Sequence, residues 1–154
     1  MGISAVRVGQ GFDIHRFSDD PSRALILGGV HFVGERGLEG HSDADVIAHA
    51  CADALLGAAG LGDIGQHFAD TDPAWKGVDS LIILDQVSVM VRAQGWLIGN
   101  IDCSVVCEQP KLAPRRDEMQ DKLSKTAGTT VSVKGRRAEG LGALGRQEGI
   151  ACWA

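Results

Sequence analysis

The stretch SDADVIAHACADALLGA, residues 42–58, predicts a helix more clearly than any other part of the sequence. Ser42 with Asp45 three residues later has the pattern of a capping box, and an apolar run follows it. Gly57 or Gly60 can end the helix, because glycine tolerates the left-handed backbone of a helix C-terminus. We therefore expect a helix here, with the other elements arranged around it.

The segments on either side of this helix alternate between strand-like and helix-like patterns. Apolar alternation and bounding turn residues predict the strands, and amphipathic spacing predicts the helices. We expect strands over 5–15, 24–33, 96–109, 129–136 and 148–154, helices over 79–94 and 114–127, a short turn or helix near 61–68, and a glycine-rich loop over 138–147. This order predicts an α+β fold, in which one mixed β-sheet carries its helices on one face.

Composition limits what kind of protein this is. The 154 residues predict a single domain over 1–154, and 44% hydrophobic with 23% charged residues is typical of a soluble globular chain. A net charge of −5 argues against general nucleic-acid binding. With no apolar run of membrane-spanning length and no signal-like N-terminus, we expect a cytoplasmic location. We interpret the four scattered cysteines as reduced thiols.

The stretch GFDIHRF, residues 11–17, suggests a metal site. Asp13 and His15 share one face of a strand, because side chains alternate along it, while Phe12, Ile14 and Phe17 are expected in the core. A solvated edge strand would explain the pattern equally simply. If the pair binds a metal, the most plausible third ligand is His49, two turns into the helix. Two imidazoles and one carboxylate form a recurring catalytic zinc set.

Two acids flank the candidate helical ligand on the same stripe of the helix. Asp45 and Asp53 lie four residues before and after His49. Either carboxylate could hold the imidazole in one tautomer from behind the metal. These two acids are therefore candidate partners for the His49 ring.

Two further regions could bind anions. His41 and Ser42 stand at a helix N-terminus, where backbone amides favour an anion, although a capping box alone explains the pattern. KGRRAEGLGALGR, residues 134–146, places four cations and one acid, Glu139, around a glycine-rich turn, which is either a solvated face or a phosphate site. Glu139 could then ligate Mg²⁺ held also by phosphate oxygens. In an acidic chain this basic loop favours a polyanionic small molecule, and Lys111 lies in a second, proline-bounded loop.

Four stretches together resemble one family. They are GFDIHRF, LGGV, GLEGHSDADVIAHACADALLGAAGLGDIGQHFADTDPAWKGVDS and GLGALGRQEGIA, and they extend over nearly the whole chain. They are similar to 2-C-methyl-D-erythritol 2,4-cyclodiphosphate synthase, of the non-mevalonate isoprenoid pathway. The resemblance implies a lyase that closes 4-diphosphocytidyl-2-C-methyl-D-erythritol 2-phosphate into the cyclic diphosphate and releases CMP. It also implies a homotrimer with active sites at subunit interfaces.

The resemblance also implies roles for individual residues. Asp13, His15 and His49 would hold Zn²⁺ or another divalent transition metal, and Glu139 would help to hold Mg²⁺ or Mn²⁺. His41 and Arg137 take catalytic positions. The substrate-binding positions are Ser42, then Asp63, Ile64 and Gly65 at the ribose, Phe68, Ala69, Asp70, Thr71 and Asp72 at the erythritol, Cys107, Glu108, Gln109, Pro110, Lys111, Leu112 and Ala113 at the cytosine, and Arg136, Ala138, Ala143 and Arg146.

The chain departs from the family pattern near Glu139. RRAE, residues 136–139, replaces TTTE, so Arg137 stands where a threonine contacts phosphate in the transition state. Arginine can do this as a cation, and we expect activity to survive. Ala143 and Ala69 replace a phenylalanine and a proline. Two alternative functions are a metal-dependent phosphoester hydrolase and a non-catalytic trimer that binds cytidine nucleotides or isoprenoids.

Overall fold

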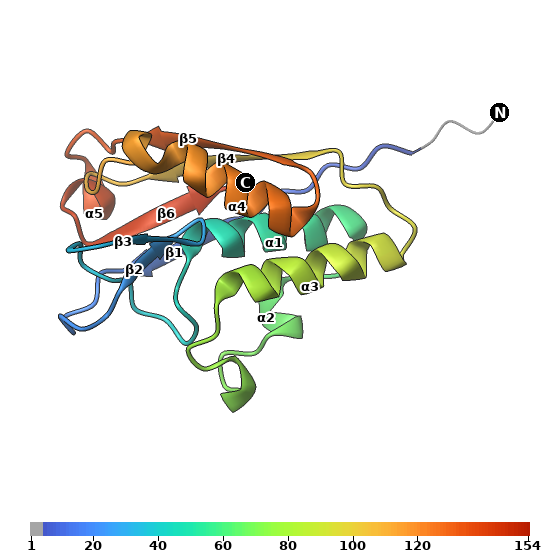
Figure 1. The fold of residues 1–154 in the computed structure, drawn as a ribbon, viewed down its shortest axis with the longest axis horizontal. Coiled ribbons are helices and arrows are strands. Elements are labelled where there is room, and N and C mark those ends of the chain that lie inside the picture. Colours follow the sequence, from blue (N-terminus) through green and yellow to red (C-terminus); the bar gives the residue numbers. More distant parts are fainter. Residues whose placement is uncertain (1–4) are drawn as a thin grey trace.

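The fold is built on one four-stranded sheet (Figure 1). The computed structural model describes residues 5–154. The strand order is β1 (Phe12–Arg16), β6 (Gly149–Trp153), β4 (Asn100–Val106) and β5 (Thr130–Arg136). β4 and β5 run parallel, whereas β6 is antiparallel to both β1 and β4. The predicted mixed sheet is therefore confirmed.

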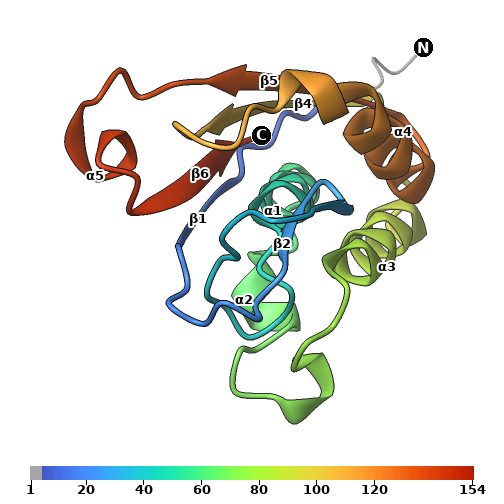
Figure 2. The same cartoon turned by 60° about the vertical axis from the view of Figure 1, so that its left-hand side comes forward.

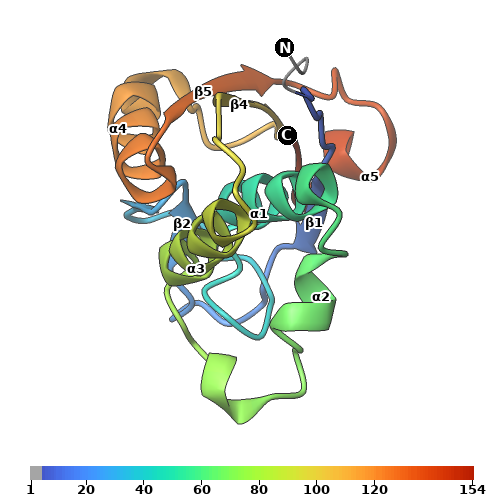
Figure 3. The same ribbon diagram turned by 90° about the vertical axis from the view of Figure 1, so that its right-hand side faces the viewer.

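Helices cover one face of this sheet, as the sequence predicts. α1 (Val46–Ala59) and α4 (Arg116–Ala127) lie against the strands, and α3 (Ser80–Ala93) packs on both helices on the side away from the sheet (Figures 2 and 3). The space between these layers holds the apolar core, which includes the fully buried Leu84 and Ile150. Shorter elements complete the chain: α2 (Ile64–His67), α5 (Gly142–Gly145) and the 3₁₀ turns Pro73–Trp75 and Ala113–Arg115.

The central helix begins later than the capping-box pattern predicts. Asp45, and not Ser42, is the N-cap, and its carboxylate accepts hydrogen bonds from the amides of Ile47 and Ala48. Ala44 has a φ of 59°, in the left-handed region, so a regular helix cannot include it. Gly60 ends the helix at a φ of 72°, as glycine commonly does.

The segment 24–33 is a hairpin and not one strand. β2 (Leu25–Leu27) and β3 (Val30–Phe32) pair with each other in a separate two-stranded sheet. Gly28 and Gly29 form the turn with φ values of 57° and 73°. A tight two-residue hairpin turn requires two residues in the left-handed region. The Gly-Gly pair in the sequence could therefore have predicted the hairpin.

The first predicted strand starts only at Phe12, and two glycines before it, Gly9 and Gly11, lie close against α1. A β-carbon added to Gly9 or Gly11 would lie 1.9 Å from a carbonyl oxygen of α1, that of Ala54 or Ala50 respectively. Side chains at these two glycines would therefore collide with the helix backbone. The glycines bring the chain that carries Asp13 into direct contact with α1.

The expectation that Phe12 and Ile14 belong to the core is wrong. Their side chains are 46% and 49% exposed, on the face of β1 away from α1. Asp13 and His15, on the other face, are partly buried. Phe17 does pack against the core. Strand alternation correctly separated the two sets, but it does not say which set faces inward.

Within residues 5–154, no helix is long and apolar enough to cross a membrane. The four cysteines are free and buried, as the sequence analysis expected.

Candidate active site

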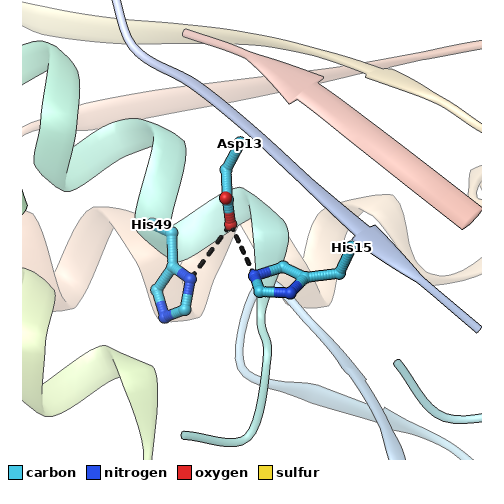
Figure 4. Close-up of side chains that lie close together, drawn as sticks. All are labelled: Asp13, His15 and His49. Atoms are coloured by element: carbon cyan, nitrogen blue, oxygen red, sulfur yellow. Dashed lines mark hydrogen bonds and ion pairs between the residues drawn. The ribbon is translucent and has the colours of Figure 1, made fainter. Parts of the chain in front are cut away.

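Asp13, His15 and His49 converge on one point between β1 and α1 (Figure 4). The Oδ2 atom of Asp13 lies 3.0 Å from His15 Nε2 and 3.0 Å from His49 Nδ1. Each residue offers a ligand atom, and all three atoms lie within 4.8 Å of one another. The structure thus brings His49 to the strand pair, as the sequence analysis predicted.

These three side chains fit a divalent metal ion. His15 Nε2 is buried and has no well-aligned hydrogen-bond partner, although Asp13 Oδ2 is only 3.0 Å away. In the neutral ring, the lone pair of His15 Nε2 could bind a metal ion. A cation between the three atoms would satisfy it, and one oxygen with two imidazole nitrogens suits Zn²⁺ and similar transition metals.

The three side chains shift one another's protonation. Burial alone would raise the pKa of Asp13, but the adjacent imidazoles of His15 and His49 outweigh burial and hold that pKa well below its usual range. Burial would lower the pKa of His15, yet the Asp13 carboxylate stabilises the imidazolium more strongly, so the pKa of His15 is raised. Without a metal, the raised pKa of His15 therefore favours the protonated form of that imidazole.

The expected acidic partner for His49 is not on its own helix. Besides capping α1, the Asp45 carboxylate accepts hydrogen bonds from the amides of Gly28 and Gly29 at 2.9 and 2.7 Å. The Asp53 carboxylate accepts a hydrogen bond from the amide of Ile64. The prediction that one of these acids orients His49 is wrong. Both carboxylates are engaged by backbone amides, which are strong donors to a buried charge.

Serine hydroxyls contact His49 instead. Its Nε2 atom lies 2.8 Å from Ser80 Oγ and 3.2 Å from Ser42 Oγ. The Ser80 hydroxyl in turn donates to a carboxylate oxygen of Asp43. Sequence reasoning missed Ser80 and Asp43, since Ser80 is 31 residues from His49 and no local spacing relates them.

One candidate substrate-binding residue, Ser42, contacts the candidate metal site directly, and His41 connects its loop to a second candidate segment. Ser42 reaches His49, and His41 Nε2 lies 2.8 Å from the carbonyl oxygen of Asp72. The loop before α1 is thereby joined to the 68–72 segment predicted to line a substrate pocket. Phe68 in that segment is buried edge-on against Trp75, with ring centroids 5.0 Å apart.

The predicted cytosine-binding residues line a cavity of about 330 Å³. Arg116, which the sequence analysis did not single out, also lines it. The full lining is Cys107, Glu108, Gln109, Pro110, Lys111, Leu112, Ala113, Arg116, Gly135, Arg136 and Arg137. A larger cavity of about 550 Å³ lies by residues 5–9 and 96–102, and no predicted site residue lines it.

Known proteins match this chain along nearly its whole length. The sequence model of the YgbB family matches residues 6–154. The chain belongs to the YgbB family. A relative from Nostoc sp., a 2-C-methyl-D-erythritol 2,4-cyclodiphosphate synthase, is 54% identical over 153 residues, which cover 97% of this chain and 92% of that protein. The resemblance stated from the sequence is confirmed.

Two solved structures of related proteins share the fold. The bifunctional IspDF of Campylobacter jejuni has a TM-score of 0.91 at 41% identity, covering 97% of this chain and 41% of that one. A CDP complex of IspF from Plasmodium falciparum has a TM-score of 0.83 at 32% identity, covering 99% and 94%. This chain corresponds to less than half of the bifunctional protein, and to nearly all of the single-function one.

The basic loop of this YgbB-family chain is less positive than its sequence suggests. Arg137 pairs with Glu108 Oε2 at 3.1–3.2 Å, and Glu108 is only 7% exposed. Lys134 pairs with Asp102 at 2.6 Å, and Arg146 with Glu148 at 2.7 Å. Acids from other segments therefore neutralise three of the four cations that sequence proximity grouped together.

Two groups of the same loop bind the carboxylate of Glu108. The Glu108 carboxylate accepts the Arg137 guanidinium and, at 3.4 Å, the amide of Gly140. Glu139, between these two donors, has a φ of 54°, in the left-handed region. A guanidinium and a glycine amide around a carboxylate are the groups that a phosphate would use. Glu139 is not part of the Asp13–His15–His49 group.

Proposed function

We propose that this chain is a metal-dependent cyclase that converts 4-diphosphocytidyl-2-C-methyl-D-erythritol 2-phosphate into 2-C-methyl-D-erythritol 2,4-cyclodiphosphate and CMP, in isoprenoid precursor biosynthesis. One observation carries the proposal: a three-ligand metal centre formed by Asp13, His15 and His49, in a chain 54% identical to a synthase of that name. A cavity lined by residues 107–113 adds a place for the cytidine end of the substrate.

The reaction needs positioning more than a protein nucleophile. The 2-phosphate oxygen attacks the β-phosphorus, and the bond from that phosphorus to the oxygen bridging the α- and β-phosphates breaks and releases CMP. The barrier lies in bringing two anions together and in stabilising the charge that develops. Zn²⁺ or a similar ion bound by Asp13, His15 and His49 would act as a Lewis acid that polarises phosphate oxygens.

The chain's own residues would hold the phosphates in place. Ser42 and His41 lie on the loop joined to His49 and to Asp72, and their donor groups would orient phosphate oxygens. Arg137 would supply a positive charge that moves from Glu108 to the reacting phosphates. Glu139 would help to bind Mg²⁺ or Mn²⁺, which would neutralise the diphosphate.

The nucleotide end would bind in two places. The backbone and side chains of residues 107–113 would surround the cytosine in their cavity. Asp63, Ile64 and Gly65, at the start of α2, would bind the ribose across a subunit interface. The CDP complex of the Plasmodium falciparum relative supports a cytidine nucleotide as the ligand class.

We further propose that the chain is a single domain that forms a cytoplasmic homotrimer. The outer face of the sheet supports this assembly, because Phe12, Ile14 and Trp153 expose 46%, 49% and 37% of their surface there. Phe12 and Trp153 already stack with centroids 4.8 Å apart. Clustered apolar side chains on a sheet face favour burial against another subunit.

Phosphorus NMR tests the proposed reaction directly. We expect the purified protein, given the diphosphocytidyl substrate with Zn²⁺ and Mg²⁺, to produce CMP and the cyclic diphosphate in equal amounts. A linear phosphate product would instead identify a hydrolase. Tight CDP binding with no turnover would identify a non-catalytic nucleotide-binding protein, and either result would overturn the proposal.

A further inference from the structure

Asp43 and Ser80 lie behind the metal centre and connect two helices. Ser80 is the first residue of α3 and is completely buried. Both of its hydrogen-bond donors point to Asp43: the hydroxyl to one carboxylate oxygen, and the amide to the other at 3.1 Å. Asp43 also accepts the amide of Asp45 at 3.1 Å. The carboxylate is therefore fixed by three donors.

This arrangement determines where the proton of His49 lies. A serine hydroxyl has one hydrogen, and an ionised carboxylate can only accept. Since Ser80 gives its hydrogen to Asp43, its oxygen can only accept in its other two contacts, which are 2.8 Å from His49 Nε2 and 3.3 Å from Ser42 Oγ. His49 therefore carries its hydrogen on Nε2.

The same proton count leaves a lone pair at the front of the ring. In the neutral tautomer with hydrogen on Nε2, the Nδ1 atom has none. Nδ1 then presents its lone pair to Asp13 Oδ2 at 3.0 Å, where two acceptors repel each other. A cation between them converts this repulsion into two ligand bonds.

We propose that Asp43 and Ser80 are positioning residues that fix His49 in its metal-binding tautomer and so set the affinity of the metal centre. This inference rests on the proposed metal site. The series of contacts runs from the Asp43 carboxylate through the Ser80 hydroxyl to the His49 imidazole, which would bind the metal. It therefore connects the loop before α1 and the start of α3 to the proposed metal site. Outer partners of ligating histidines commonly affect metal affinity by 10- to 100-fold.

Metal affinity tests the proposal without reference to turnover. The metal-free protein competes with a chromophoric chelator for Zn²⁺, and the dissociation constant is compared among variants. We expect Ser80→Ala and Asp43→Asn each to raise it by roughly 10- to 100-fold. Asp43→Asn acts because its amide can donate to Ser80, which frees the hydroxyl to donate to His49 and to favour the wrong tautomer.

Ser88→Ala is the matched control. Ser88 lies on the same helix, is equally buried, and donates to the Leu84 carbonyl at 2.8 Å, away from the metal centre. We expect its zinc affinity to stay within about twofold of the wild type. Thermal unfolding of each metal-free variant separates loss of affinity from loss of fold. If Ser80→Ala does not fold, Asp43→Asn, which keeps the side-chain shape, decides.

A spectroscopic measurement gives an independent test. In the zinc-loaded protein, the His49 Nε2 proton should be observed by NMR in slow exchange with water, and Ser80→Ala should accelerate its exchange while Ser88→Ala should not. Zinc affinities of Ser80→Ala and Asp43→Asn within twofold of the wild type would overturn the inference. Absence of zinc binding by the wild type would instead overturn the proposed metal centre.

Discussion

His49 is the candidate metal ligand that the helix layer contributes, opposite Asp13 and His15 on the sheet. Replacing it with alanine removes one of three ligand atoms, so we expect His49→Ala to lose zinc on dialysis, as measured by elemental analysis. His67→Ala is the control, because the His67 ring nitrogen contacts the Leu61 carbonyl and the residue lies outside the ligand group. Full zinc occupancy in His49→Ala would refute the ligand assignment.

His15 gives the metal-free protein a characteristic pH dependence. Its pKa is raised from 6.5 by Asp13, so the folded state binds a proton more tightly than the unfolded state. The resulting stabilisation is fully present below pH 6.5 and is lost as the pH rises through the raised pKa. We expect the free energy of unfolding to fall over that range in urea titrations.

The His15→Gln variant is the comparison for this pH effect. Its side chain does not titrate, so the decrease above pH 6.5 should become shallower. An unchanged pH profile in His15→Gln would assign the effect to another group.

Arg137 is the most unusual of the candidate catalytic residues. The Arg137 side chain is 68% exposed, and its guanidinium pairs with Glu108. Because it is exposed, it can leave Glu108 and turn toward a bound phosphate. We expect Arg137→Ala to lower kcat by about 100-fold, the typical effect of removing one donor to developing charge. Arg36→Ala removes another exposed guanidinium, which pairs with Asp19, and should leave kcat unchanged. Equal kcat values for the two variants would exclude a catalytic role for Arg137.

At the level of elements, Asp45 connects α1 to the β2–β3 hairpin. Its carboxylate accepts two amides of α1 and those of Gly28 and Gly29. Losing the cap costs about 1 kcal/mol, and leaving buried amides unpaired adds about 1–3 kcal/mol. We expect Asp45→Ala to lower the free energy of unfolding by about 2–4 kcal/mol in denaturant titrations.

Asp79→Ala is the matched control for Asp45→Ala. Asp79 caps α3 through a single exposed bond to the amide of Leu81, so its loss should cost only about 1 kcal/mol. Equal costs for the two variants would mean that the hairpin contacts of Asp45 contribute nothing.

The elements also show which features the sequence could predict. Regular periodicity predicted α1, α3, α4 and the main strands, and the two-residue spacing of Asp13 and His15 predicted that they share a face. The exposure of Phe12 and Ile14 was not predictable from one chain, because alternation does not identify the buried face. Ser80 and Asp43 were missed for a different reason, since their relation to His49 exists only after α1 and α3 pack.

At the level of the whole molecule, the outer sheet face should determine assembly. We expect Ile14→Lys, which puts a charge in the exposed apolar cluster, to convert the proposed trimer into monomers in light scattering. Val33→Lys changes a side chain that is also exposed, at 80%, but lies just after β3 and not in this cluster. It should stay trimeric. A trimeric Ile14→Lys variant would mean that subunits meet elsewhere.

The position of the candidate metal ligands on β1 and α1 has a consequence for the protein in the cell. A metal site formed by both layers exists only in the folded chain, so the free energy of metal binding adds to the free energy of folding. A free metal concentration 100 times the dissociation constant would contribute about 2.7 kcal/mol. Cells starved of the metal would therefore lose folded protein to proteolysis. The supply of the ion would control the amount of this protein as well as its activity.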